Sequence, residues 1–401
     1  MVTLTMYEKK KAEVVQMVMD GKIGIEMAGQ VLGRTVRTVY RLLARVRGRG
    51  LEGVIHGNRG NDHAKVYTDV IKGRILHLVR GRYRDINDTH LAELLCKNEG
   101  IKVSRQWLRL LLRGSGIKSK RRRRRPRYRS RRERKEAFGM MIQIDASEHD
   151  WLEGRGPKMV LVGGIDDATG FVWGRFEESE SSWGYLSLIR QICLSHGIPL
   201  SLYSDRHTIF FSPKEPTIIE QLQNIRHLTQ FGRAMKELNV EMIPAYSAPA
   251  KGRIEKLWNT LQDRLIVEMR LKGIQTRDEA NTSLQEFLKD YNKRFTVPAR
   301  KKEWVFRKKP PLCQLDRILC LKETRTVQKD HTVSFEGLAL QIPPSPKWAS
   351  IAKQRVDVLQ LKNGNIEIIY KNMVIAKFES PTIMRLLKLY KLKNNELQNV
   401  A

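Results

Sequence analysis

Apolar residues follow two different spacings along the chain, and the change between them divides it into regions. Up to about residue 117 they recur every three or four positions, as do Leu91, Leu94 and Leu95, and this spacing predicts amphipathic helices. From residue 139 onward, short apolar runs typical of buried strands alternate with helical segments. We therefore expect a multidomain α+β protein whose central region is an α/β core.

The first helical region predicts a helix-turn-helix DNA-binding unit over residues 1–50. A short helix around Ala28 is followed by a turn at Gly33 and by a second helix. The second helix is expected to bury one face, made of Val36, Val39, Tyr40 and Leu43. Polar and basic side chains on the other side could meet bases and phosphates, namely Arg34, Arg37, Thr38 and Arg41. The alternative is an ordinary helical hairpin with a solvated basic face.

Residues 51–117 predict a second helix-turn-helix or winged-helix unit. Asp88 and Thr89 can cap one helix, and Ser104 can cap the next. Trp107 on that next helix is expected in the core rather than stacked on a base. The same helix carries two candidate DNA contacts, Arg105 and Arg109.

Charge is the most unusual property of the composition. The chain has 74 Lys and Arg against 43 Asp and Glu, a formal net charge of +31, which points to nucleic acid as the partner. Residues 118–137 hold 13 basic and 2 acidic side chains, whereas residues 138–274 hold 15 and 17. We expect residues 118–138 to be a linker that follows a DNA backbone, with a solvated tail or a localisation signal as the alternative. Its candidate contacts are Arg121, Arg122, Arg123, Arg124 and Arg125.

Other features argue against a membrane or disulfide-rich protein. The sequence has no run of about 18 apolar residues, and its first residues lack the apolar region of a signal peptide. The four cysteines form no C-x-x-C pair, and the His and Cys residues show no zinc-binding spacing. We expect a reduced, cytoplasmic setting without a structural zinc ion.

Residues 139–274 predict a ribonuclease-H-like core. The expected order is three strands, a helix, a strand, a helix, a strand and a helix. The strands are expected at 139–147, 158–164, 171–176, 200–204 and 240–243, and the helices at 182–196, 229–238 and from 252 on. In this layout the first and fourth strands are parallel neighbours.

Three carboxylates occupy matching places in these elements. Asp145 lies inside the first strand, Asp205 ends the fourth, and Glu255 lies in the first turn of the last helix. If the strands are neighbours, the three acids converge and can hold two divalent ions, most naturally Mg²⁺. Asp205 taken alone could be a turn residue and Glu255 a helix cap, but an acid inside a strand is costly unless it has a partner. Asp166 and Asp167 are expected to belong to a hairpin turn rather than to this site.

The C-terminal region predicts a helix, a linker and a small β-barrel. Thr276 and Glu279 form a capping box for a helix, which with the basic, Pro-containing stretch after it fills residues 275–324. A barrel is expected over residues 325–380, where Asn363 and Gly364 predict a tight hairpin turn. Residues 381–401 are expected to be a basic tail.

Four segments resemble a known family of proteins. They read MIQIDASEHDW, LVGGIDDATGFV, LYSDRHTIF and AKGRIEKLW, and they resemble bacterial insertion-sequence transposases with a retroviral-integrase-like DDE core, of the ISNCY group. The resemblance covers about residues 10–300. It implies that Asp145, Asp205 and Glu255 are the catalytic and metal-binding triad, and that the C-terminal barrel is SH3-like.

The sequence also departs from the pattern of this family. His207 stands in a motif where many relatives have D-N-G, and it could contact the DNA or brace the loop. Gln262 occupies a position where many relatives have a basic residue, and Arg264 is nearby. We therefore expect the basic residues that position the DNA to lie at the start of the helix, at Lys251, Arg253 and Lys256. The spacing between Asp205 and Glu255 implies an insertion, placed at 212–228.

The resemblance and the residues together predict a DNA transposase. It would bind double-stranded DNA at the ends of an insertion sequence, hydrolyse a phosphodiester there and transfer the strand into target DNA. Two Mg²⁺ ions, replaceable by Mn²⁺, would serve each site, with no nucleotide cofactor and at least a dimer on DNA. We expect a bacterial, nucleoid-associated cytoplasmic enzyme. The alternatives are an inert DNA-binding regulator derived from a transposase and a ribonuclease-H-type nuclease.

Overall fold

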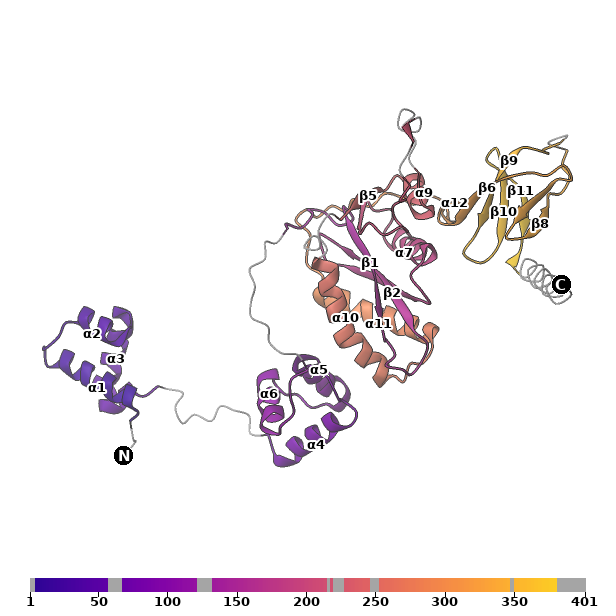
Figure 1. The fold of residues 1–401 in the computed structure, drawn as a ribbon. Coiled ribbons are helices and arrows are strands. Elements are labelled where there is room, and N and C mark those ends of the chain that lie inside the picture. The colour runs from indigo at the N-terminus through magenta and orange to yellow at the C-terminus, as the bar shows by residue number, and fades with distance from the viewer. Residues whose placement is uncertain are drawn as a thin grey trace. The chain divides into compact units, whose positions relative to one another are not determined.

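The computed structural model describes most of the chain and divides it into two compact units. The described residues are 4–56, 67–120, 132–214, 217–218, 227–245, 252–346 and 350–380. The units are Met1–His77 and Leu78–Ala401 (Figure 1). Several predicted features lie outside the described residues, namely Arg121 to Arg125, Lys251, most of the 212–228 insertion and the 381–401 tail.

The first unit contains three helices, α1 (Met6–Met19), α2 (Ile25–Leu32) and α3 (Val36–Arg49), and a short 3-10 helix η1 (Gly50–Val54). Gly33 ends α2 with a positive φ of 60°, which glycine adopts without strain. The predicted buried face of α3 was wrong in part, because Val36 is 40% exposed and Tyr40 is 57% exposed. The buried face is instead the set Val39, Leu42, Leu43 and Val46, spaced as one helical stripe. The helix-turn-helix assignment itself stays a prediction.

The helices that follow are α4 (Asp69–Arg80), α5 (Asp88–Glu99) and α6 (Arg105–Gly114). The cap of α5 is Asn87, whose side chain accepts from the backbone of Thr89 and His90, so the predicted Asp88–Thr89 cap lies one residue too late. Ser104 caps α6 as expected. Trp107 is only half-buried, because Leu108 and Leu112 occupy the core positions of α6. The described residues between 67 and 120 contain no strand and hence no wing.

The central sheet has the predicted strand order. Its strands are β1 (Ile142–His149), β2 (Met159–Asp166), β3 (Val172–Glu177), β4 (Ser201–Ser204) and β5 (Glu241–Pro244). They lie in the order β3-β2-β1-β4-β5, with β1 antiparallel to β2 and parallel to β4, and β4 parallel to β5. The expected adjacency of the first and fourth strands is therefore confirmed.

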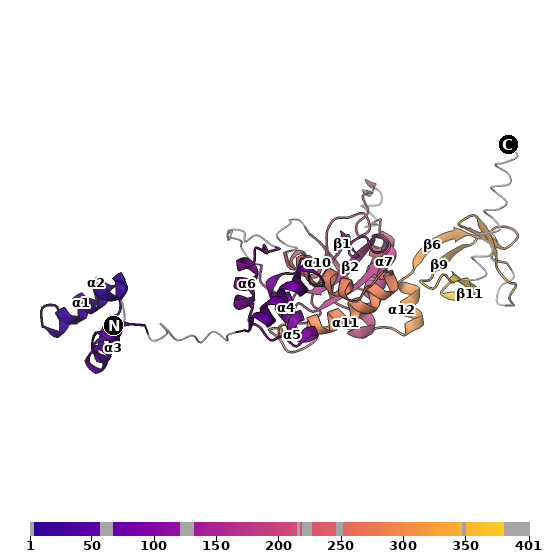
Figure 2. The ribbon, with the colours of Figure 1, turned by 90° about the horizontal axis from the view of Figure 1, so that it is seen from below.

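Helices cover both faces of this sheet (Figures 1 and 2). One core packs α7 (Ser182–Ser195) and α9 (Gln230–Glu237) against residues such as Ile142 and Ile144. The other packs α10 (Gly252–Leu271) and α11 (Arg277–Phe295) against residues such as Leu161 and Phe176. The capping box of Thr276 and Glu279 is present at α11. Neighbouring strand residues supply opposite cores because strand side chains alternate between faces.

The C-terminal strands do not form the predicted closed barrel. A short helix, α12 (Leu312–Ile318), leads to β6 (Leu321–Thr326), β7 (Thr332–Phe335), β8 (Leu338–Gln341), β9 (Arg355–Gln360), β10 (Ile366–Tyr370) and β11 (Met373–Phe378). They form a four-stranded sheet, β11-β10-β9-β6, and a separate two-stranded sheet, β7-β8. The two sheets share one apolar core, so burial is achieved without hydrogen bonds that close a barrel among the described strands. The predicted turn at Asn363 and Gly364 joins β9 to β10.

The stretch after α11 was predicted to be a linker, and it is instead bound to the core. The backbone N–H groups of Val297, Lys301 and Val305 donate to carbonyl groups of Thr169, Glu136 and Phe138. We call residues 296–309 the strap. Among the described helices, none is long and apolar enough to cross a membrane.

Candidate active site

Helix α10 lies along β1, and alternate residues of the strand contact it in turn. The Trp258 indole Nε1–H of α10 donates to Asp145 Oδ2 at 3.0 Å. Two residues further along β1, the Ser147 hydroxyl accepts from Gln262 Nε2 at 3.2 Å. Gln143, two residues before Asp145, donates to Asp167, which also accepts from Arg253 of α10. The face of β1 that carries Asp145 is therefore the face covered by α10.

Asp145 and Asp205 lie at matching levels of neighbouring strands. The parallel register pairs Ile142 with Leu202 and Gln143 with Tyr203. Continuing that register by two residues places Asp145 beside Asp205. Both residues are half-buried, and the Asp205 carboxylate accepts from the backbone N–H of His207 at 3.1 Å.

The pKa of the buried Tyr185 hydroxyl on α7 is affected by both carboxylates. Burial raises the pKa of the Tyr185 hydroxyl, and its hydrogen bond to Glu180 at 2.6 Å raises that pKa further. The negative charges of Asp145 and Asp205 add to the same effect. Tyr185 therefore stays a neutral phenol beside a concentration of negative charge, which is the electrostatic setting that a cation neutralises.

Glu255 enters from the first turn of α10. It is exposed and lies three residues before Trp258, so the two residues share one side of the helix. Among the described residues, however, no three His, Cys, Asp or Glu side chains lie close enough to hold a metal ion. The strand register thus points Asp145 and Asp205 to the same level of the sheet, and Glu255 lies on the adjoining helix, without the three forming one cluster among the described residues.

The packing of Trp258 depends on a glycine in the adjacent strand. Gly163 of β2 pairs with Asp145 across the sheet. A Cβ atom at Gly163 would lie 2.6 Å from Cη2 of Trp258, whose side chain is only 7% exposed. The sequence analysis assigned no role to Trp258. The signal it missed is a glycine inside a buried strand, which often marks a close approach by another group.

Asp166 and Asp167 lie at the predicted hairpin turn between β2 and β3, and both are buried there. Asp166 accepts from the N–H and hydroxyl of Thr169 at 2.7 and 2.8 Å, and burial raises the pKa of its carboxyl. Asp167 is fully buried and pairs with Arg253 at 2.7 Å and with Arg132. Because Arg253 is paired with Asp167, binding DNA would require its guanidinium group to contact both Asp167 and the DNA.

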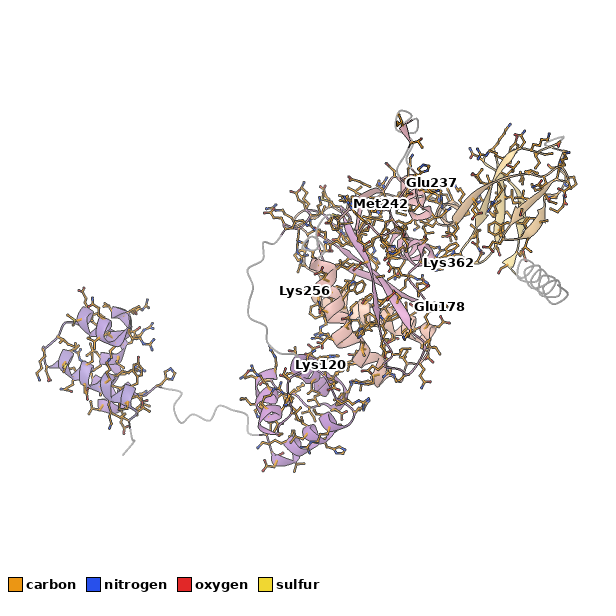
Figure 3. All side chains as sticks on the ribbon, in the orientation of Figure 1. Lys120, Glu178, Glu237, Met242, Lys256 and Lys362 are labelled. Atoms are coloured by element: carbon orange, nitrogen blue, oxygen red, sulfur yellow. The ribbon has the colours of Figure 1, made fainter. Side chains whose placement is uncertain are left out.

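The remaining candidate DNA contacts are placed as follows. Six are exposed on α3, α6 and the turn before α3, namely Arg34, Arg37, Thr38, Arg41, Arg105 and Arg109. His207 is exposed next to Asp205, and Lys256 is exposed on α10 (Figure 3). Gln262 is bonded to Ser147, and Arg264 pairs with Glu93 at 2.7 Å. The structure does not bring all of these residues to one site.

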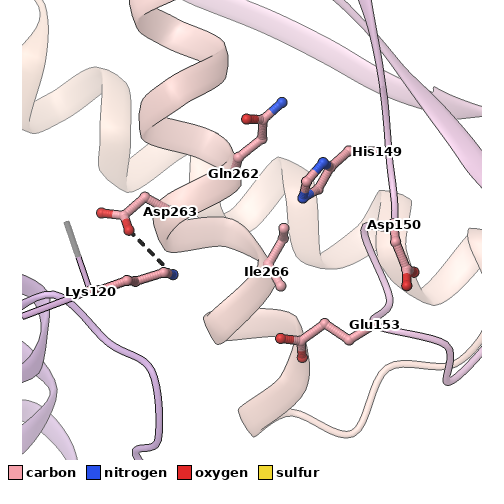
Figure 4. A pocket seen from close by; sticks show the side chains of 7 residues that line it. All are labelled: Lys120, His149, Asp150, Glu153, Gln262, Asp263 and Ile266. Atoms are coloured by element: carbon pink, nitrogen blue, oxygen red, sulfur yellow. Dashed lines mark ion pairs between the residues drawn. The ribbon is translucent and has the colours of Figure 1, made fainter. Parts of the chain in front are cut away.

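A cavity of about 500 Å³ lies beyond the far end of β1, away from the acids (Figure 4). An ion pair between Lys120 and Asp263, at 3.3 Å, crosses one side of it. Its lining is Lys120, His149, Asp150, Glu153, Gln262, Asp263 and Ile266. We place the candidate chemistry at the acids rather than in this cavity, because the cavity contains neither Asp145 nor Asp205.

Comparison with known proteins gives two close relatives over most of the chain. The sequence is 34% identical to a Sinorhizobium fredii protein described as a transposase, over 92% of this chain and 80% of that protein. It is 30% identical to the transposase for insertion sequence IS1202 of Streptococcus pneumoniae, over 90% of this chain and 84% of that protein. The HTLV-2 integrase catalytic core domain, solved with magnesium in a trimeric form, is similar at 16% identity and a TM-score of 0.27, over 37% and 84% of the two chains. No family model matches the chain.

Proposed function

Because this chain belongs to the transposases of insertion sequences, DNA-binding enzymes of the polynucleotidyl-transferase type, we propose that its chemistry takes place at Asp145, Asp205 and Glu255. The observation that carries this proposal is the parallel register of β1 and β4, which sets Asp145 beside Asp205. The reaction would be hydrolysis of a phosphodiester at each end of the element, followed by attack of the freed 3′-OH on target DNA. Each step exchanges one P–O bond for another, so it requires no external energy source.

The donor set suits a divalent cation. The three side chains offer only carboxylate oxygens, the ligands that Mg²⁺ prefers, with Mn²⁺ as the natural substitute. Asp145, Asp205 and Glu255 would hold two ions, which would supply activation of the attacking oxygen and stabilisation of the leaving oxygen. The paired negative charge felt at Tyr185 supports a cation at this place.

The protein's own groups orient these carboxylates. Trp258 donates to one oxygen of Asp145, and the backbone of His207 donates to one oxygen of Asp205. Each hydrogen bond restricts the rotation of a carboxyl group and so orients its remaining lone pairs for binding a metal ion. The indole of Trp258 also covers the sheet beside Asp145 and so keeps water from that side.

DNA recognition would be divided among the parts of the chain. The exposed polar residues of α3 and α6 would contact bases and phosphates, and the 118–138 segment with Arg121 to Arg125 would follow the backbone. Lys251, Arg253 and His207 would contact the DNA near the acids. Because each of the two element ends needs its own DNA-recognition surface, we propose that at least a dimer binds the DNA.

The test is a cleavage and joining assay on a labelled duplex that carries the element's own end. We expect nicked and joined products with Mg²⁺ or Mn²⁺ and none with EDTA, at equal occupancy of the DNA. Tight binding of the end without chemistry under any divalent metal would overturn the proposal and favour a DNA-binding regulator.

Replacing Trp258 by Phe tests whether the indole N–H orients Asp145. A hydrogen bond to a charged group contributes about 1.5–3 kcal/mol, so we expect the Mg²⁺ concentration for half-maximal cleavage to rise about tenfold or more. Calorimetric titration with Mn²⁺ in the absence of DNA should show the same weakening. Trp173→Phe is the matched control, because the Trp173 indole donates to Ser195 Oγ and not to an acid of the site. Equal metal dependence in Trp258→Phe and wild type would limit Trp258 to packing.

A further inference from the structure

The strap is bound to the core by backbone hydrogen bonds and by an aromatic contact. Arg307 and Ile198 exchange two backbone hydrogen bonds of 2.9 Å, in an antiparallel bridge. Phe306 packs against Phe138 with ring centroids 4.9 Å apart. A Cβ atom on Gly139 would lie 2.5 Å from the Phe306 ring, so the core is shaped to receive this side chain. The strap is therefore fixed at its centre.

Trp304 is an exposed aromatic side chain on this fixed segment. It is 66% exposed, more than any other tryptophan or tyrosine in the part of the chain that the structure describes. The indole is held against Phe138, with ring centroids 5.3 Å apart and planes at 90°, and against His196, with centroids 5.8 Å apart. An aromatic ring that is exposed but held in place can bind another flat ring at little cost in conformational entropy.

The surroundings of Trp304 are strongly basic. Exposed cations of the strap stand on both sides of it, namely Arg300, Lys301, Lys302, Lys308 and Lys309, and the one acid within residues 296–309 is Glu303. The strap also adjoins residues 132–136, the end of the basic linker, through the Lys301–Glu136 ion pair at 2.6 Å. The basic character of the linker thus continues along the strap.

A polyanion that carries flat rings matches this combination of features. Basic side chains attract phosphates, and an exposed aromatic ring stacks on a base only if that base is not already paired. We propose that the strap is a binding surface for an unpaired DNA strand, with Trp304 stacking on a base and the lysines and arginines following the backbone. Phe138, which touches Trp304, precedes Asp145 by seven residues, a separation of at most about 25 Å or roughly seven steps of B-DNA. The partner in this inference rests on the proposed function, because a DNA-cutting enzyme generates unpaired strand ends.

The experiment measures binding without chemistry. Full-length protein in EDTA is titrated into a labelled thymidine oligonucleotide and, separately, into a blunt duplex of the same length. We expect Trp304→Ala to weaken binding of the single strand by about five- to a hundredfold and binding of the duplex by less than about twofold. Trp304→Tyr should restore most of the affinity. Leu312→Ala is the matched control, because Leu312 is an exposed apolar residue just after the strap, and it should leave both affinities unchanged.

A second readout locates the contact directly. Photocrosslinking with a bromodeoxyuridine oligonucleotide should label the peptide that contains Trp304, and the label should disappear in Trp304→Ala. Wild-type affinity of Trp304→Ala for the single strand, together with crosslinks only outside residues 296–309, would overturn the proposal. So would loss of binding to vesicles of an anionic lipid with unchanged binding to DNA, which would assign the strap to a membrane surface. Because no metal is present, these outcomes are independent of whether Asp145 is catalytic.

Discussion

We expect replacement of Asp145 by Asn to eliminate strand cleavage and joining while the element end remains bound. The change removes a negative charge from the pair formed with Asp205, and a cation held between them loses one of its anionic ligands. Metal ions contribute several kcal/mol of charge stabilisation in such reactions, so we expect the rate of cleavage to fall by at least about a thousandfold. DNA affinity should stay equal or rise slightly, because the phosphate meets less negative charge.

The assay uses labelled end DNA with Mg²⁺, and gel shift gives the occupancy of the same samples. Asp205→Asn and Glu255→Gln should behave in the same way. Glu148→Gln is the matched control and should keep wild-type activity. Glu148 is an exposed carboxylate on the same strand, and because strand side chains alternate, it lies on the opposite face from Asp145. Full activity of any of the three acid variants would remove that residue from the site.

We expect removal of residues 1–56 to reduce the preference for the element end over a scrambled duplex by at least about a hundredfold. Base-edge contacts supply specificity, and specific sites are typically bound a thousandfold or more tighter than non-specific DNA. The exposed residues of α3 are the candidates for such contacts in the first unit. Much non-specific affinity should persist, because most of the basic charge lies after residue 56.

The deletion ends at residue 56 because a longer one would reach α5, which belongs to the second unit and contacts α10. His90 of α5 contacts Glu268 of α10 at 3.2 Å, and Asn87 donates to Asp263. A cut at residue 117 would remove these partners and disturb the helix that carries Glu255. Competition anisotropy at fixed salt gives the preference, and Arg37→Gln beside Lys10→Gln separates base reading from general charge. An equal loss of affinity for both duplexes would show that the first unit contributes charge alone.

The order of the central elements was accessible from the sequence because it depends on local patterns. Apolar runs, caps and turn residues marked the strands and helices, and a known layout then placed Asp145 beside Asp205. The contacts that were missed join residues far apart in the chain. The hydrogen bond from Trp258 to Asp145 and the close approach at Gly163 are examples.

Segments in which apolar residues show no regular spacing were the hardest to interpret. The strap has a proline and many cations, as linkers do, yet it is held by backbone hydrogen bonds that leave little trace in composition. The barrel is not confirmed for a related reason, because strand signals predict strands but not whether the first and last of them pair. On α3, the predicted stripe included Val36 and Tyr40 because spacing alone does not decide which of two adjacent stripes faces the neighbouring helices.

The buried carboxylate of Asp167 ties together two segments that are distant in the chain. It pairs with Arg132 at the end of the basic linker and with Arg253, two residues before Glu255. Loss of a partner from a buried ion pair costs about 3–5 kcal/mol, a large share of the stability of a folded domain. A substitution at Arg132 or Arg253 is therefore constrained by Asp167, because it leaves that buried carboxylate with one cationic partner fewer. Among descendants of this gene the three positions should be inherited as one unit.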